Sequence, residues 1–213
     1  MNFSAIRELF EVYDNAYGYT EEELVVQESR MNIKLPAALR AYYGAFGKHK
    51  EMNQTQDRLI LPEELHVDRS GRMVFYAENQ FVAAWCILLS DMGLDNPPVY
   101  VSYDDEHWQE EGSTVTAFLI SMAYLQAIFA FRFAANMAGV TDDIISLVKQ
   151  HWKKVEGTVS IWQVAFYQNT KDEILALMQS PDQTDLFIAA KSAEQLIAMD
   201  ALLKVDWDYH TME

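Results

Sequence analysis

Residues 112–131 form a run of twenty amino acids without a charged side chain. Because a membrane-spanning helix needs about 20 apolar residues, this segment must either cross a bilayer or lie in a protein core. Gln126 interrupts the run, Arg132 follows it, and its upstream flank is acidic where a membrane anchor carries Lys or Arg. We therefore expect a buried core helix, and a membrane span is the weaker alternative.

The charge balance restricts the partners of this chain. It has 16 Lys and Arg against 32 Asp and Glu, a formal net charge of −16. Such a chain repels phosphate backbones and anionic membranes, so we expect a basic protein partner and no nucleic acid or membrane. Cys86 is the only cysteine, which excludes a disulfide framework. With no signal-peptide pattern, this favours the cytoplasm.

Three helices are predicted in the first 47 residues. The clearest start is Thr20, which forms a capping box with Glu23. Ser4 is expected to cap the first helix, and Pro36 begins the third, which Gly47 ends. The first predicted helix follows Ser4 and has its apolar face over 6–13, and the other two predicted helical segments are 21–30 and 36–46.

The periodicity then changes from helical to extended. Short runs of β-branched and aromatic residues are separated by turn-forming Ser, Gly, Asn and Pro residues, which predicts a mainly antiparallel meander. A long helix over 114–138 should pack across it, so the expected fold class is α+β, with helices on a mixed, mainly antiparallel sheet. The predicted strands are 58–61, 73–77, 81–89 and 99–103.

The last third is predicted as a C-terminal β-α-β-α extension that either continues the main sheet or forms a subdomain. The expected boundary lies at Gly139, giving a main domain over 1–139 and an extension over 140–213. A helix over 142–153 is its first predicted element. Its predicted strands are 159–167 and 186–190, and its predicted helices are 171–178 and 192–205.

No motif of a common catalytic or cofactor site is present. The five histidines are far apart and lack the spacing of a zinc site, and neither glycine-rich phosphate loop occurs. Gly-x-Ser-x-Gly is also absent, and Cys86 lies in an apolar run that makes it an inert core thiol. We therefore predict no catalytic residue, metal or cofactor.

One acidic segment, residues 103–111, is the best candidate for a binding surface. It follows a predicted strand and places aromatic side chains among five carboxylates. Aromatic residues anchor interfaces and carboxylates select a basic partner. The alternative is an ordinary connection with its tryptophan in the core. The candidate partner-binding residues are Asp104, Asp105, Glu106, Trp108, Glu110 and Glu111.

The central segment, about 21–129, resembles the SUKH superfamily, which includes fungal regulators of cell-wall assembly and glucan synthesis and bacterial immunity proteins of polymorphic toxin systems. The family's frequent Gly-Gly after the helix is here only Gly44 and Gly47, and residues after about 141 have no counterpart. The resemblance depends on the order and spacing of Leu35-Pro36-Ala37-Ala38-Leu39-Arg40-Ala41-Tyr42-Tyr43, Leu61-Pro62-Glu63-Glu64-Leu65, Phe75-Tyr76-Ala77-Glu78-Asn79, Trp85-Cys86-Ile87, Asn96-Pro97-Pro98-Val99-Tyr100, Trp108 and Phe118-Leu119.

The resemblance implies an α+β, non-enzymatic protein that acts by binding others. The expected function is that of an immunity protein that neutralises a basic toxin such as a nuclease. A cell-wall or glucan synthesis regulatory scaffold is one alternative. Another is a small hydrolase or ligand-binding enzyme with a cleft between the sheet and the C-terminal unit, using residues such as Glu78, Asp104 and His107.

Overall fold

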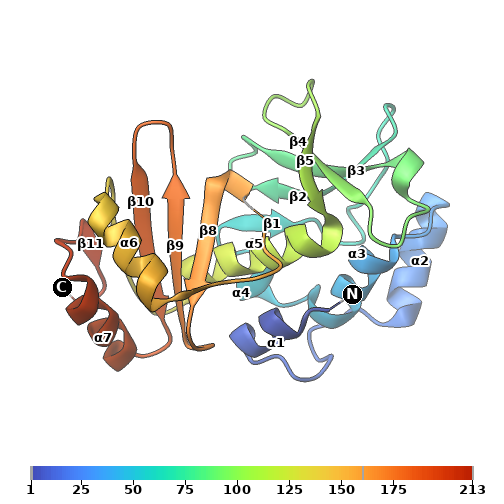
Figure 1. Ribbon diagram of the computed structural model, residues 1–213. Coiled ribbons are helices and arrows are strands. Elements are labelled where there is room, and N and C mark those ends of the chain that lie inside the picture. Colours follow the sequence, from blue (N-terminus) through green and yellow to red (C-terminus); the bar gives the residue numbers. More distant parts are fainter. Residues whose placement is uncertain (1, 160, 213) are drawn as a thin grey trace.

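The computed structural model describes residues 2–159 and 161–212 and has two antiparallel sheets with helix α5 (Val115–Ala130) between them (Figure 1). The uncharged segment is thus a core helix as predicted, and it contacts strands of both sheets. Among the described residues, no helix has the length and apolar character needed to cross a membrane. The α+β fold class is confirmed.

The first sheet is the predicted antiparallel meander, with its five strands in chain order. Four strands match the predicted ones, and the fifth occupies the end of the acidic segment, where no strand was predicted. Because adjacent strands pair directly, residues 103–108 become the loop of a hairpin. The strands are β1 (Asp57–Leu59), β2 (Arg72–Glu78), β3 (Ala84–Leu88), β4 (Pro98–Ser102) and β5 (Gln109–Thr114).

Of the N-terminal helices, three pack against α5 and the fourth, α2, packs against α3. The predicted capping box of Thr20 and Glu23 is present. The predicted cap of Ser4 is wrong, because Ser4 is already helical and its backbone N–H donates to Asn2 Oδ1 at 2.9 Å. The helices are α1 (Ser4–Phe10), α2 (Glu21–Met31), α3 (Ala37–Phe46) and the short α4 (Lys50–Asn53).

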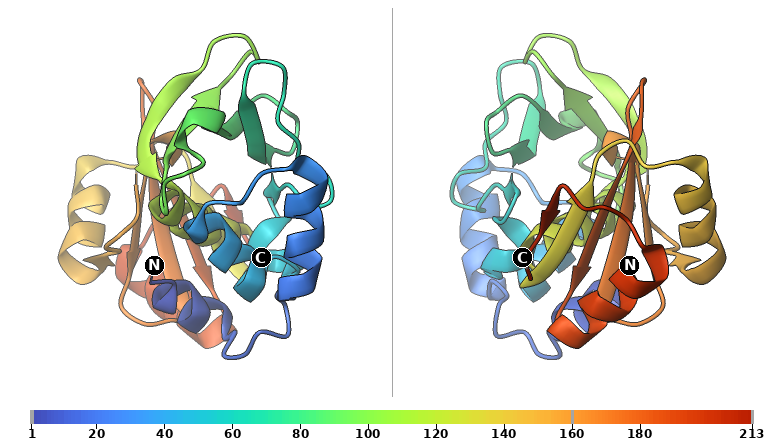
Figure 2. Two further views of the ribbon diagram at one scale, coloured as in Figure 1. Left: turned by 90° about the vertical axis from the view of Figure 1, so that its right-hand side faces the viewer. Right: turned by 90° about the vertical axis from the view of Figure 1, so that its left-hand side faces the viewer.

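The second sheet has six strands in the order β11-β6-β10-β9-β8-β7. Helices α6 and α7 cover its outer face, away from α5, and enclose a second small core (Figure 2). A 3-10 turn, Ile161–Gln163, precedes β8, and another, Leu89–Asp91, follows β3. The elements are β6 (Phe133–Met137), α6 (Asp142–His151), β7 (Lys153–Lys154), β8 (Val164–Gln168), β9 (Glu173–Gln179), β10 (Thr184–Ala190), α7 (Ala193–Leu203) and β11 (Tyr209–His210).

Two predicted helical segments are wrong. Residues 171–178 were expected to be a helix, but β9 pairs with β8 and β10 on its two sides. The long helix was expected to reach residue 138, but it ends at Ala130, and β6 pairs with β10 and β11. The β-α-β-α order is therefore wrong as well, and the second sheet uses a strand from before Gly139.

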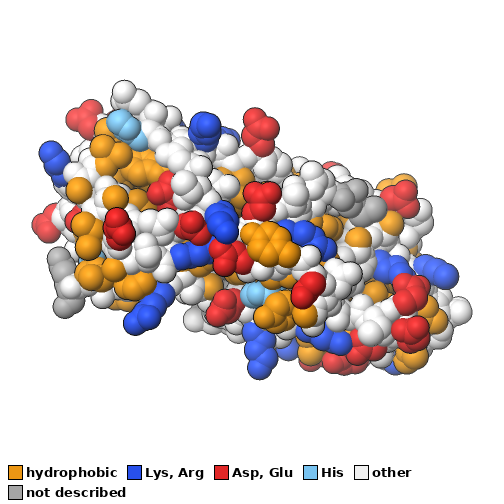
Figure 3. Space-filling view, turned by 90° about the horizontal axis from the view of Figure 1, so that it is seen from below, with side chains coloured by type: hydrophobic (Ala, Val, Ile, Leu, Met, Phe, Trp, Pro, Cys, Tyr) orange, Lys and Arg blue, Asp and Glu red, His pale blue; other side chains and the backbone are white. Residues whose placement is uncertain are grey.

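Ion pairs join α1 to the second sheet. Glu11, at the end of α1, lies 2.8 Å from Lys171 Nζ and 3.5 Å from Lys191 Nζ. Lys191 also lies 3.5 Å from Asp172. On the face seen from below, positive and negative side chains lie next to one another (Figure 3).

Candidate functional site

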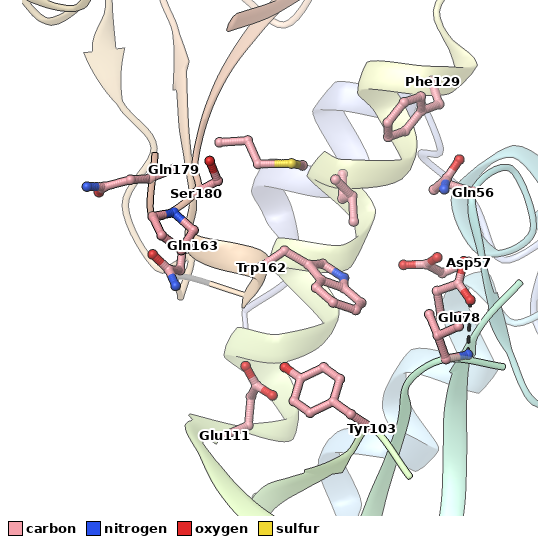
Figure 4. A pocket seen from close by; sticks show the side chains of 14 residues that line it. Gln56, Asp57, Glu78, Tyr103, Glu111, Phe129, Trp162, Gln163, Gln179 and Ser180 are labelled. Atoms are coloured by element: carbon pink, nitrogen blue, oxygen red, sulfur yellow. Dashed lines mark hydrogen bonds between the residues drawn. The ribbon is translucent and has the colours of Figure 1, made fainter. Parts of the chain in front are cut away.

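A cleft of about 600 Å³ lies between the two sheets, beside α5 (Figure 4). β1 and β2 form one wall, the ends of the β4–β5 hairpin form another, and the segment before β8 and the end of β9 complete it. Its lining residues are Gln56, Asp57, Glu78, Val82, Tyr103, Glu111, Leu125, Phe129, Trp162, Gln163, Met178, Gln179, Ser180 and Pro181.

Strand pairing places two carboxylates side by side in this cleft. Asp57 and Glu78 are directly opposite each other in the antiparallel register of β1 and β2. Because strand side chains alternate, Asp57 shares the inner face with Leu59, and Arg58 points away. Directly opposed residues have Cβ atoms roughly 5 Å apart, and like charges at that distance repel each other.

The side chain of Asp57 is buried. The residue is 2 % exposed, and its Oδ2 accepts no hydrogen bond from any residue that the structure describes. Its side chain faces the cleft (Figure 4). Burial, and then the negative charge of Glu78, raise the pKa of Asp57 to about 7.

Helix α5 fixes the backbone that carries Asp57. Gln126 Nε2 donates to the carbonyl oxygen of Asp57 at 2.7 Å and to the hydroxyl oxygen of Tyr76 at 2.9 Å. Gln126 Oε1 accepts the backbone N–H of Gln56 at 2.6 Å. The polar residue that interrupts the apolar segment therefore holds the edge strand of the cleft.

Glu78 is fixed by the turn that follows it. Its Oε2 accepts the backbone N–H groups of Gln80 at 2.7 Å and Val82 at 3.3 Å. Both of these hydrogen bonds go to one oxygen. Among the residues that the structure describes, Glu78 thus keeps its place beside Asp57 without an ion pair.

Aromatic rings and a third carboxylate form the opposite end of the cleft. Glu111 Oε2 accepts the indole N–H of Trp85 at 3.1 Å, and burial raises the pKa of Glu111 against the effect of this hydrogen bond. The ring of Trp162 lies 5.7 Å from that of Trp85 and 5.8 Å from that of Tyr103, between centroids. These contacts join the two sheets at the cleft.

The backbone that presents Trp162 is strained. Trp162 has φ 56° and ψ 23°, and Gln163 has φ 54°. Left-handed conformations are uncommon for bulky residues and cost of order 1–3 kcal/mol each. Such strain clusters at functional sites, and here it affects two consecutive residues of the cleft wall.

Exposed apolar side chains surround the mouth of the cleft. Val82, Tyr103 and Phe129 line it and are largely exposed, and Phe81 is exposed on the same turn as Val82. Among the described residues that line the cleft there is no Lys, Arg or His. An apolar rim above carboxylates that have no cation among the lining residues is suited to a ligand that is apolar along its length and positive at its tip.

The predicted partner-binding residues lie on the adjoining hairpin, and Glu111 is the only one that lines the cleft. Asp104 accepts the backbone N–H groups of Glu106 at 3.0 Å and His107 at 2.8 Å, and these bonds with the His107 ring hold the pKa of Asp104 well below its usual range. This carboxylate shapes the loop. The other exposed carboxylates of the hairpin are Asp105, Glu106 and Glu110.

Trp108 does not lie in the core, but its side chain contacts neighbouring residues. It is half-buried, the Arg72 guanidinium lies 5.1 Å from its ring centroid, and its indole N–H donates to the carbonyl oxygen of Asp105 at 3.2 Å. Of the residues named for the enzymatic alternative, Glu78 lines the cleft, whereas Asp104 and His107 are exposed on the hairpin.

Sequence reasoning missed Asp57 and Trp162. Asp57 alternates with Leu59 in the strand, and this period-2 pattern is a signal that places it on the buried face. Trp162 gives no such signal, because its place depends on contacts with the distant residues Trp85 and Tyr103.

Comparisons with protein-family models, curated proteins and solved structures each found no match. The resemblance to the SUKH superfamily stays a prediction. Within 2–159 and 161–212, no group of three or more His, Cys, Asp or Glu side chains is arranged to hold a metal ion.

Proposed function

We propose that this chain is a non-enzymatic protein-binding module that holds a positively charged segment of a protein partner in the cleft and on the 103–111 hairpin. The observation that carries the proposal is the cleft itself. It contains Asp57, Glu78 and Glu111 with no cationic side chain among its lining residues, below an exposed apolar mouth.

The charge of the whole chain supports the same partner chemistry. A net charge of −16 attracts a basic protein from a distance and accelerates encounter at low salt. The exposed carboxylates of the hairpin extend the negative surface beyond the cleft. A basic toxin, such as a nuclease whose own groove binds phosphates, has the complementary charge. Neutralisation of such a toxin is the role that the sequence resemblance favours.

Site-specific photo-crosslinking tests this proposal. A photoreactive amino acid replaces Val82 at the mouth of the cleft, and in a control variant it replaces Ile197 on α7. The two positions are matched in exposure, at 53 % and 52 %. We expect a basic protein to be crosslinked from position 82 and not from position 197. The recovered protein, purified, should bind the unmodified chain with an affinity that falls as salt rises.

Three results would count against the proposal. They are equal crosslinking from both positions, a crosslinked protein that is acidic, and a purified complex whose affinity does not change with salt. Neutralisation is tested separately, by measuring the toxic activity of the recovered partner with and without this chain.

A further inference from the structure

The partner group that enters the cleft can be inferred from the carboxylates at its base. The geometry points to one arginine side chain of the partner, with its guanidinium group between Asp57 and Glu78 and its flat face toward the aromatic rings of Trp162 and Tyr103. This inference rests on the proposed function and specifies its chemistry.

Of the three carboxylates that line the cleft, Asp57 has the fewest hydrogen-bond donors among the described residues. A buried carboxylate without a hydrogen-bond donor is costly, and Asp57 Oδ2 has none within the described residues. Glu78, directly across the strand pair, has its two hydrogen bonds at one oxygen, Oε2. A cationic donor group placed between the two side chains would separate the two negative charges. Because Oδ2 itself is covered, a rotation of the Asp57 carboxylate would bring this oxygen to the donor group.

The surroundings favour a guanidinium over an ammonium group. Guanidinium is planar, more weakly hydrated, and presents several N–H donors in a fixed fork that can reach two carboxylates. It also stacks on aromatic faces, and Trp162 and Tyr103 lie in contact with each other at the same cleft. The apolar rim can cover the methylene stem of the side chain. An ammonium group lacks the planar fork and loses more hydration.

Nuclear magnetic resonance of the tryptophan indole groups tests the inference. The chain has five tryptophans, so the indole region of the spectrum contains five N–H signals to assign. The probes are three blocked tripeptides, acetyl-Gly-Arg-Gly-amide and its Lys and norleucine counterparts. We expect the Arg peptide to cause a saturable shift of the Trp162 signal, the Lys peptide to bind at least threefold more weakly, and the norleucine peptide to cause no saturable shift.

Two variants, each lacking one carboxylate, test whether Asp57 is the group that binds the arginine side chain. Asp57→Asn keeps the size of the side chain and should weaken Arg-peptide binding at least tenfold. Asp143→Asn removes the same charge from the exposed start of α6, outside the cleft, and should change it less than twofold. The dispersion of the five indole signals shows that each variant is folded.

The outcomes separate this inference from the proposed function. Equal binding of the Arg peptide by wild type and Asp57→Asn, or equal binding of the Arg and Lys peptides, overturns the arginine assignment. If the partner crosslinked from position 82 still binds Asp57→Asn with unchanged affinity, the inference is wrong and the proposed function stands. If the Arg peptide binds but no protein is crosslinked, the arginine site is supported and the proposed protein-binding function is wrong.

Discussion

Burial of the Asp57 carboxylate lowers the stability of the protein when no ligand is bound. Its pKa of about 7, raised from 3.8 mainly by burial, means that the folded state prefers the protonated form. The contribution of this group to the free energy of unfolding is fully present below pH 3.8, where the carboxyl is protonated in both states. It is lost as pH rises from 3.8 through 7. From the shift, the loss is of order 4 kcal/mol.

Asp57→Asn should therefore unfold at a higher urea concentration than wild type at pH 8, with a gain of roughly 2–4 kcal/mol. The gain should shrink as pH falls toward 4, because the wild-type carboxyl is then neutral. Asp143→Asn is the control and should show no such pH-dependent gain. An Asp57→Asn variant that is less stable than wild type at pH 8 would show that the carboxylate contributes to the fold.

Cys86 gives an independent test of core burial at the residue scale. It is buried, and burial raises the pKa of its thiol to about 12. Because only the thiolate reacts, we expect almost no reaction with a thiol reagent at pH 8 in the native protein and complete reaction in urea. Rapid native reaction would contradict the packing of β3.

At the scale of elements, the segments with local signals were predictable. The capping box fixed the start of α2, and the turn residues separated the strands of the meander. β9 was not predictable, because Glu173-Ile174-Leu175-Ala176-Leu177-Met178 consists largely of good helix formers. Pairing with β8 and β10 on both sides overrides that preference. The cleft could not be predicted either, because it depends on how the two sheets face each other.

Gln126 links an element of the core to the cleft. Its replacement by Leu leaves the Asp57 carbonyl, the Tyr76 hydroxyl and the Gln56 N–H without this partner. The bonds to the Asp57 carbonyl and the Tyr76 hydroxyl are buried, and the bond to Gln56 is partly buried. Each unpaired buried group costs about 1–3 kcal/mol, so the two buried groups alone predict that Gln126→Leu loses roughly 2–6 kcal/mol of unfolding free energy. Gln109→Leu makes the same change at an exposed strand position and should stay within about 0.5 kcal/mol of wild type.

Gly18 allows the loop after α1 to approach α3. A Cβ atom at this position would overlap the carbonyl oxygen of Gly44, and neither backbone segment is a flexible side-chain end. Gly18→Ala should lower the unfolding free energy by about 1–3 kcal/mol. Gly93→Ala is the matched control, because a Cβ atom there meets nothing within 4 Å. Equal stability of the two variants would contradict this packing.

At the scale of the molecule, the distribution of charge decides how a partner arrives. Acidic and basic side chains are mixed on the face below α1 (Figure 3), whereas the lining of the cleft is acidic and carries no cation. Long-range attraction acts mainly on the association rate, and contacts inside the cleft act mainly on the dissociation rate. The two contributions can therefore be separated by kinetics.

With the partner recovered by crosslinking, Glu106→Gln with Glu110→Gln should slow association a few-fold at low salt and leave dissociation nearly unchanged. Asp57→Asn should instead accelerate dissociation. Surface plasmon resonance at two salt concentrations measures both rates. The reverse assignment of the two effects would mean that the hairpin, and not the cleft, holds the partner.

The most direct measurement is the pKa of Asp57, followed by carbon-13 resonance of its carboxyl group with and without the acetyl-Gly-Arg-Gly-amide peptide. The ionisable groups that act on it are Glu78 and Tyr76, both from β2, and Glu111 and Tyr103 lie at the opposite end of the cleft. The neighbouring Arg58 lines an adjoining pocket with Asp57 and Glu78, but its side chain pairs with Glu64. We expect a pKa near 7 in the free protein and a value at least one unit lower at saturating peptide, because a bound guanidinium favours the charged carboxylate. An ordinary pKa in the free protein, or a value near 7 that the peptide does not change, would contradict the account.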